Sequence, residues 1–204
     1  MMLGKVAIVL ALALALVGCS GSYEQPRYTA SQTSDGFEVR DYASYVVAET
    51  PIAGGTDEAS DDGFRRLFDY ISGQNTGAQE ISMTAPVTTA PQKIAMTAPV
   101  TQQKGEGGAV MRFMMPSSFT LDTLPKPTDP AVSLRTVPAE RFAVLRYSGS
   151  WSSGLYEEQL ATLRAAMARA GLEATGEPIW ARYDPPFTPW FLRRNEIMIP
   201  VAGG

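Results

Sequence analysis

Two stretches of the chain, 56–72 and 152–170, space their apolar residues as one face of a helix does. The first stretch carries Phe64, Leu67, Phe68 and Ile71, and the second carries Tyr156, Leu160, Leu163 and Met167. A glycine follows each stretch, Gly73 or Gly171, and glycine favours the end of a helix. The pattern predicts two amphipathic helices, each with one buried face.

Short apolar segments bounded by turn-forming residues surround both helices and predict strands. They are 37–39, 45–47, 81–100, 109–115, 132–134, 142–147, 178–183 and 191–201, with a proline-rich linker over 125–130. An offset of 95 residues aligns Val39 with Leu134 and Arg40 with Arg135. We therefore predict an α+β fold made of a duplicated βαββ unit. The two halves form one antiparallel sheet or distorted barrel with two main helices packed on it. The concave face between the halves is the expected ligand site.

The N-terminus has the features of a secretion signal. After Lys5, residues 6–17 are twelve consecutive apolar residues, about 18 Å as a helix and too short for a bilayer core of about 30 Å. The end of this run and the two residues after it, Leu16-Val17-Gly18-Cys19, resemble the lipobox of bacterial lipoproteins. In that family the chain is cut before the cysteine, and the cysteine is acylated. We expect a signal peptide over 1–18, a lipidated N-terminus and tether over 19–35, and a folded domain over 36–201.

The location expected from this resemblance is the cell envelope. Ser20 follows Cys19, and by resemblance to Gram-negative sorting this favours the periplasmic face of the outer membrane. Removal of residues 1–18 takes away Lys5 and no acidic residue, so the net charge changes from −4 to −5. An acidic chain without a basic patch is not expected to bind nucleic acid.

Two residue counts limit the chemistry. The chain contains no histidine and a single cysteine, Cys19. A histidine-dependent catalytic triad, a histidine-ligated zinc or haem iron, an iron–sulfur cluster and an intrachain disulfide are thereby excluded. No acid–base pair or activated nucleophile stands out, so we expect a protein that is not an enzyme.

A seven-residue motif occurs twice. Residues 81–87, Ile-Ser-Met-Thr-Ala-Pro-Val, recur as Ile-Ala-Met-Thr-Ala-Pro-Val at 94–100, with six of seven residues identical. Each copy is interpreted as an apolar strand that ends at a proline, at a sheet edge, a strand end or a bulge.

These motifs give the sequence its resemblance to the SOUL haem-binding protein family. The resemblance extends over about residues 23–201, with halves at about 36–116 and 131–201. It rests on Phe64-Arg65-Arg66-Leu67-Phe68, on both Met-Thr-Ala-Pro-Val copies, on 111–116, and on the segments 183–186 and 188–196. The family's fold is similar to the effector-binding domain of some transcription regulators. The resemblance implies a lipid-anchored protein that binds haem or a related tetrapyrrole non-covalently, as a carrier or buffer.

The resemblance also points to candidate binding residues, which are Arg65, Arg66, Phe68, Met83, Met96, Trp190 and Glu196. Arg65 and Arg66 lie on the helix expected to form one pocket wall, where they would meet propionates. Methionine could ligate iron, but it also fills gaps in cores. Glu196 either faces the ligand groove or pairs with an arginine, and pairing is favoured. The 183–191 loop is either a rigid connector or an aromatic lip.

Three other functions remain open at this point. An enzyme that acts on tetrapyrroles or another substrate would show turnover of added haem, as a loss of its absorbance with a new product. The same fold could bind another amphipathic small molecule, and a selective response to haem over other flat hydrophobic anions would separate the two. A structural envelope lipoprotein would show no gain in thermal stability from any ligand.

Overall fold

The computed structural model describes residues 23–33, 35–53, 57–76, 92–105 and 108–203. Residues 1–18, Cys19, and the first Met-Thr-Ala-Pro-Val copy with Met83 lie outside the described residues. No helix within the described ranges is both long and apolar enough to cross a membrane. All described elements and core clusters fall within 23–203, so a chain of residues 20–204 contains the whole described fold.

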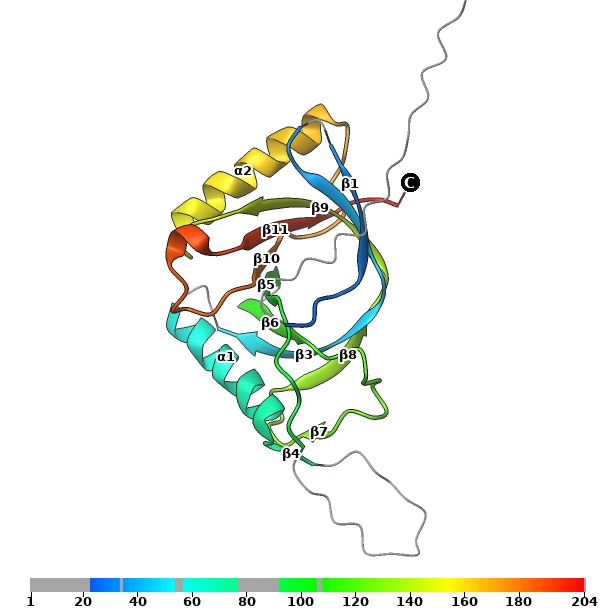
Figure 1. The fold of residues 1–204 in the computed structure, drawn as a ribbon, viewed down its shortest axis with the longest axis vertical. Helices are drawn as coiled ribbons and strands as arrows, with labels where there is room; N and C mark the ends of the chain where they lie inside the picture. Colours follow the sequence, from blue (N-terminus) through cyan, green and yellow to red (C-terminus); the bar gives the residue numbers. More distant parts are fainter. Residues whose placement is uncertain (1–22, 34, 54–56, 77–91, 106–107, 204) are drawn as a thin grey trace, which may run out of the picture.

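The predicted duplication is confirmed (Figure 1). The first half contains β2 (Glu38–Tyr42), β3 (Tyr45–Ile52), α1 (Asp57–Ser72), β5 (Val100–Gly105) and β6 (Gly108–Met114). The second half contains β8 (Ser133–Val137), β9 (Glu140–Tyr147), α2 (Ser153–Arg169), β10 (Ile179–Arg182) and β11 (Asn195–Pro200). Both ends of β2 and β8, and both ends of β3 and β9, are related by the offset of 95 seen in the sequence.

One antiparallel sheet joins the halves in the order β1-β2-β9-β11-β10-β5-β6-β3-β8, with β1 (Tyr28–Gln32) at one edge. The first strand of each half pairs with the other half, because β2 lies beside β9 and β8 lies beside β3. The junction is the pairing of β5 with β10 at the centre of the sheet. A small second sheet pairs β4 (Asn75–Thr76) with β7 (Lys126–Pro127).

Both helices pack on the outer face of the curled sheet (Figure 1). α1 covers mainly β3 and β6, and α2 covers mainly β9 and β11. Each helix closes its own apolar core, and a third cluster lies on the inner face. Gly73 and Gly171 have positive φ just beyond the two helices, as predicted for their C-terminal ends.

The predicted apolar stripe of α1 is only half correct. Leu67 and Ile71 are buried, but 38 % of Phe64 and 47 % of Phe68 is exposed. The cause is Gly63, where an added Cβ would lie 2.3 Å from the Ile52 side chain. Because this glycine lets the helix approach β3 closely, the buried face is centred on Leu67 and flanked by Gly63, and the two phenylalanines lie at its border.

The predicted tether over 19–35 is wrong for the part that the structure describes. Residues 28–32 form β1, which pairs along its whole length with β2. All five residues of β1 are exposed, so no apolar alternation marked it in the sequence. Upstream of it, residues 23–27, here called the N-terminal strap, bond to the segment just before β5, where the Ala98 amide donates to the Glu24 carbonyl. The fold therefore begins before residue 36.

Two strand predictions are also wrong in part. Residues 94–99 form no strand, because Pro99 cannot donate to a ladder and Thr97 donates its hydroxyl to the Met114 carbonyl instead. Over 191–201, only β11 is a strand. The segment before it contains the short 3-10 helix η1 (Trp190–Leu192), which follows Pro189.

Candidate functional site

The junction of the halves presents two faces, because successive side chains of a strand point to opposite sides of the sheet. On the inner face lie Thr101 of β5 and Ala181 of β10, which are directly opposite each other. The outer face between the two helices carries Val100, Gln102, Trp180 and Arg182, all half-buried. We call these four residues the junction face.

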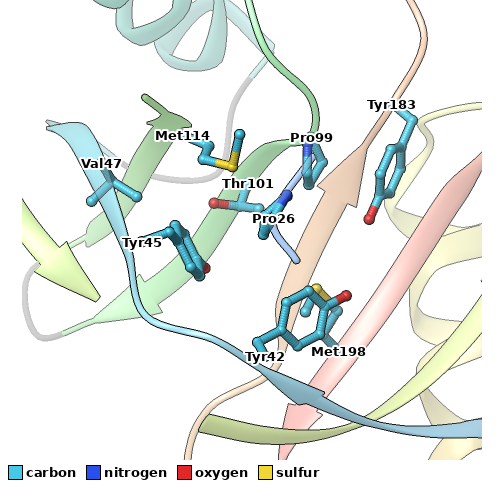
Figure 2. A pocket seen from close by; sticks show the side chains of 9 residues that line it. All are labelled: Pro26, Tyr42, Tyr45, Val47, Pro99, Thr101, Met114, Tyr183 and Met198. Carbon is cyan, nitrogen blue, oxygen red and sulfur yellow. The ribbon is translucent and has the colours of Figure 1, made fainter. Parts of the chain in front are cut away.

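The inner face is tightly packed where the strap meets β5. Figure 2 shows Pro26 and Pro99 approaching each other across the interior, with Tyr42, Tyr45 and Tyr183 around them. The remaining cavity has a volume of about 20 Å³, enough for about one water molecule. This part of the concave site expected from the sequence is therefore filled, and the N-terminal strap supplies part of the filling through Pro26.

A larger cavity of about 340 Å³ lies along the strap. Tyr45, Met114 and Phe119 form apolar parts of its wall, and Glu24 and Arg27 add charge. The Glu24 carboxylate accepts a hydrogen bond from the Ser117 amide at 2.9 Å. Its volume lies at the low end of the range for small-molecule sites, about 300–1,000 Å³.

Glu196 is a structural carboxylate rather than a groove residue. It is fully buried on β11 and accepts hydrogen bonds from Arg40 at 2.8 and 3.1 Å and from Arg194 at 3.0 and 2.8 Å. The Tyr183 hydroxyl donates a further bond at 2.7 Å. Burial alone would raise the pKa of Glu196, but the bonds and charge of Arg40 and the charge of Arg194 hold it below its usual value. The favoured interpretation of Glu196, pairing with arginine, is confirmed.

The outer face carries a stack of alternating cations and rings at the side of α2. Arg193 lies 4.2 Å from the Trp151 ring centroid, Arg182 lies 4.8 Å from the same ring, and Arg182 lies 4.2 Å from the Trp180 ring. Trp180 in turn stacks on Tyr156 of α2, with centroids 4.8 Å apart. We call these five residues the stacked ladder. It presents ring edges together with positive charge, because the ring faces are covered within the stack.

The ladder also fixes the loop between β10 and β11. Arg193 donates to the backbone carbonyls of Thr188 at 2.8 Å and Pro186 at 2.6 Å. The Trp151 indole donates to Asn195 at 2.9 Å. Residues 185–192, here called the aromatic loop, are thus held at their base. The sequence predicts either a rigid connector or an aromatic lip over 183–191. These bonds show that the segment is held rigidly, as either role requires.

α1 borders the junction face through its two exposed phenylalanines. Phe64 contacts Phe113 of β6 edge-on at 5.2 Å and stacks with Phe68 at 6.0 Å. Phe113 is opposite Val100, and Val100 is opposite Arg182. Since neighbouring strands are about 4.8 Å apart, Phe64 lies about two strands from the ladder.

The two candidate arginines of α1 do not lie on the same side. Successive helix residues are rotated by about 100°, so Arg65 lies next to Phe68 while Arg66 lies on the opposite flank. Consistent with this, Arg66 approaches Asp129 at 3.9 Å and Arg65 pairs with Asp62 at 3.2 Å. Both side chains are exposed. Of the two, Arg65 lies nearer to Phe68 and therefore nearer to the junction face.

The other candidates are distributed over the molecule. Met96 is half-buried and packs against the core under α1. Trp190 is exposed in η1, whereas Glu196 is buried on the inner face. Met83 and Cys19 lie outside the described residues. The structure thus brings Phe68 and Arg65 to one surface and separates them from Glu196.

Sequence reasoning missed Trp180, Arg182 and Arg40. Alternation along 179–182 places Trp180 and Arg182 together on one face of the strand and Ala181 on the other. This pattern alone could have marked Trp180 and Arg182 as neighbours. Arg40 stood out only as the equivalent of Arg135 at the offset of 95. Its burial against Glu196 depends on the swapped pairing of β2 with β9, which no local pattern encodes.

Comparisons with known proteins agree on family and fold. A family model described as SOUL heme-binding protein matches residues 23–200. Heme-binding protein 1 of Xenopus tropicalis is 26% identical over 162 residues, 79% of this chain and 81% of that protein. The Bos taurus protein of the same name is 24% identical over 158 residues, 78% of this chain and 76% of its own length.

Solved structures share the fold at low sequence identity. The EcmrR C-terminal domain aligns with a TM-score of 0.52 and 14% identity, covering 87% of this chain and 99% of that domain. A hydrolase from Listeria innocua aligns with a TM-score of 0.57 and 11% identity, covering 84% and 94%. At such identities the likeness extends to the fold alone.

Proposed function

Because the chain belongs to the SOUL heme-binding protein family, we propose that it binds haem or a related tetrapyrrole non-covalently on the junction face. We further propose that acylated Cys19 anchors it to the cell envelope, where it acts as a carrier or buffer and not as an enzyme. The observation that carries the site is the outer aromatic surface bordered by cations, whereas the cavity beside Pro26 and Pro99 on the inner face is only about 20 Å³.

The residues present suit a flat, anionic, largely apolar ligand. Phe68 offers an exposed ring, Trp180 offers the edge of a ring whose faces are covered by Arg182 and Tyr156, and Arg65 offers a positive charge to a carboxylate. The side-chain nitrogen of Gln102 is buried with no hydrogen-bond partner among the described residues. An unsatisfied buried donor costs about 1–3 kcal/mol, so a nearby ligand acceptor would be favoured.

Iron ligation contributes little to this binding. The chain has no histidine, and Met111 and Met167 are buried under the helices. Burial raises the pKa of Tyr156 to about 12, which disfavours a tyrosinate ligand. Haem would supply the macrocycle and its propionates, and the chain would hold them by ring contact and charge. This suits reversible carriage.

Two neighbouring arginines provide a matched test. Haemin titration of residues 20–204, followed by the Soret band, should saturate near one equivalent. Arg65→Glu should weaken binding about tenfold, because a lost ion pair and a new repulsion each contribute up to about 1 kcal/mol. Arg66→Glu, with the same charge change on the far flank, should stay within about threefold. Equal effects of both variants, or a linear unsaturating response, would reject the site.

A second candidate function is the binding of another amphipathic small molecule. The cavity of about 340 Å³ along the strap favours it, since apolar walls and two charged residues line the same space. Ser44 is exposed and lines this cavity, so Ser44→Trp would narrow it without overpacking the core. A ligand lost in Ser44→Trp but retained in Arg65→Glu would assign the function to the strap cavity.

A further inference from the structure

The aromatic loop carries the most exposed large apolar side chains among the described residues. Phe187 is 85 % exposed, and Trp190, Phe191 and Leu192 are each 59–65 % exposed. Residues 185–192 contain no charged side chain. Four such side chains within six residues are unusual on a surface that meets only water.

The loop that carries these exposed side chains is held in place by hydrogen bonds at its base and within it. Arg193 bonds to two carbonyls of the loop and stacks on Trp151, and the Asp184 carboxylate accepts from the Arg194 amide. Bonds also close the loop internally, from the Thr188 amide to the Pro185 carbonyl and from the Leu192 amide to the Pro189 carbonyl. The chain therefore holds these apolar side chains outward.

The N-terminal strap meets the base of the same loop. Arg194, two residues beyond η1, donates to the Gln25 side chain at 3.2 Å. Cys19 is six residues before Gln25, so its backbone reaches no further than about 21 Å from that residue. An acyl anchor on Cys19 would thus keep a bilayer within reach of the aromatic loop.

We propose that the aromatic loop inserts into the interface of a phospholipid bilayer beside the acyl anchor. Tryptophan and phenylalanine are favoured at the level of the lipid headgroups. The contact is apolar, because the chain without residues 1–18 has a net charge of −5 and anionic lipid would repel it. Since Arg193 links the loop to the stacked ladder, insertion brings the junction face next to the membrane. The inference rests on the proposed anchor and names the bilayer as the source or destination of the ligand.

The test uses residues 20–204, which cannot be acylated, with neutral phosphatidylcholine vesicles. We expect the protein to co-sediment with vesicles, with little dependence on salt. Phe187→Ser/Phe191→Ser should lower the partition coefficient at least about tenfold, since each exposed aromatic contributes apolar area. The control, Tyr28→Ser/Leu121→Ser, also removes two exposed large apolar side chains, but outside the loop and the junction face, and should change the coefficient less than threefold. Brominated lipid should quench emission in the wild type but not in Trp190→Phe.

Three results would overturn the proposal. The first is no partition of a folded wild-type protein, as judged by circular dichroism. The second is an equal loss in the two double variants. The third is a dimer in vesicle-free buffer that the loop variant abolishes, which would assign the loop to self-association. Haemin titration without lipid, and the intact mass of the protein extracted from its own membrane, test the proposed function separately.

Discussion

The buried carboxylate of Glu196 allows a quantitative test of how the two halves are held together. It lies on β11 of the second half and accepts two bonds from Arg40 of β2 in the first half. Glu196→Gln keeps the shape and removes the charge. Arg40, whose side chain is 3% exposed, then retains only Glu38 as a carboxylate partner at 2.6 Å. Breaking a buried ion pair in this way costs about 3–5 kcal/mol.

Thermal unfolding followed by circular dichroism measures this loss. For a domain of this size, each kcal/mol lowers Tm by about 2–4 °C, so Glu196→Gln should lower it by about 6–20 °C. The control is Glu49→Gln on the same inner face. Glu49 bonds to Arg112 at 2.8 Å and Arg135 at 3.0 Å, but its side chain is 19% exposed and Arg135 is 43% exposed. Partial solvation reduces the expected cost to about 1 kcal/mol.

The pH dependence has a definite sign. Because the folded-state pKa of Glu196 lies below its usual value, its contribution is complete above the pKa of an unfolded glutamate, about 4.3. It is lost as the pH falls from there through the folded-state pKa. The difference between wild type and Glu196→Gln should therefore be full at pH 7 and narrow below about pH 4. A Glu196→Gln protein no less stable at pH 7 than Glu49→Gln would refute the reasoning.

Two further predictions concern packing around the helices, and chemical denaturation checks both. Gly63→Ala should destabilise by about 1–3 kcal/mol despite the better helix propensity of alanine, because the new Cβ would lie 2.3 Å from the Ile52 side chain. Gly154→Ala on α2, with nothing within 4 Å, should be neutral or stabilising, and equal losses in the two would contradict the close approach of α1. Trp151→Phe keeps a ring for the ladder but removes the donor to the buried Asn195 side chain, so it should cost about 1–3 kcal/mol. A neutral Trp151→Phe would show that this bond contributes nothing.

The duplication was predictable because the chain contains two copies of the same pattern of strands and helix. The two helices have apolar periodicity, and the strands before them share residues such as Arg40 and Arg135 at a fixed offset. The strand bounds then follow that offset at both ends. What could not be predicted is which strands pair across the halves. Pairing of β2 with β9 joins residues about 100 positions apart, and the register is set only in the folded sheet.

The site was harder to predict because its candidate residues were chosen from sequence motifs. A motif does not show on which face of a helix or strand each side chain lies. Arg65 and Arg66 are adjacent in the chain, and the rotation of a helix places them on different flanks. The strap escaped detection because its residues and those of β1 are polar and exposed, although Pro26 reaches the interior. Stacking of Arg182 on Trp180 has a local signal in the alternation along β10, but the extension of the ladder to Tyr156, Trp151 and Arg193 has none.

The central claim is that the ligand lies on the outer junction face and not inside the sheet. The most direct measurement is an NMR titration with ferric haemin, because paramagnetic broadening falls with the sixth power of distance. Trp180 lies on the junction face, whereas Met114 and Met198 line the inner cavity. We predict that the Trp180 indole proton signal broadens at low haemin while the methyl signals of Met114 and Met198 remain sharp. Broadening of those methyl signals with a sharp Trp180 indole would place the ligand inside and contradict the account.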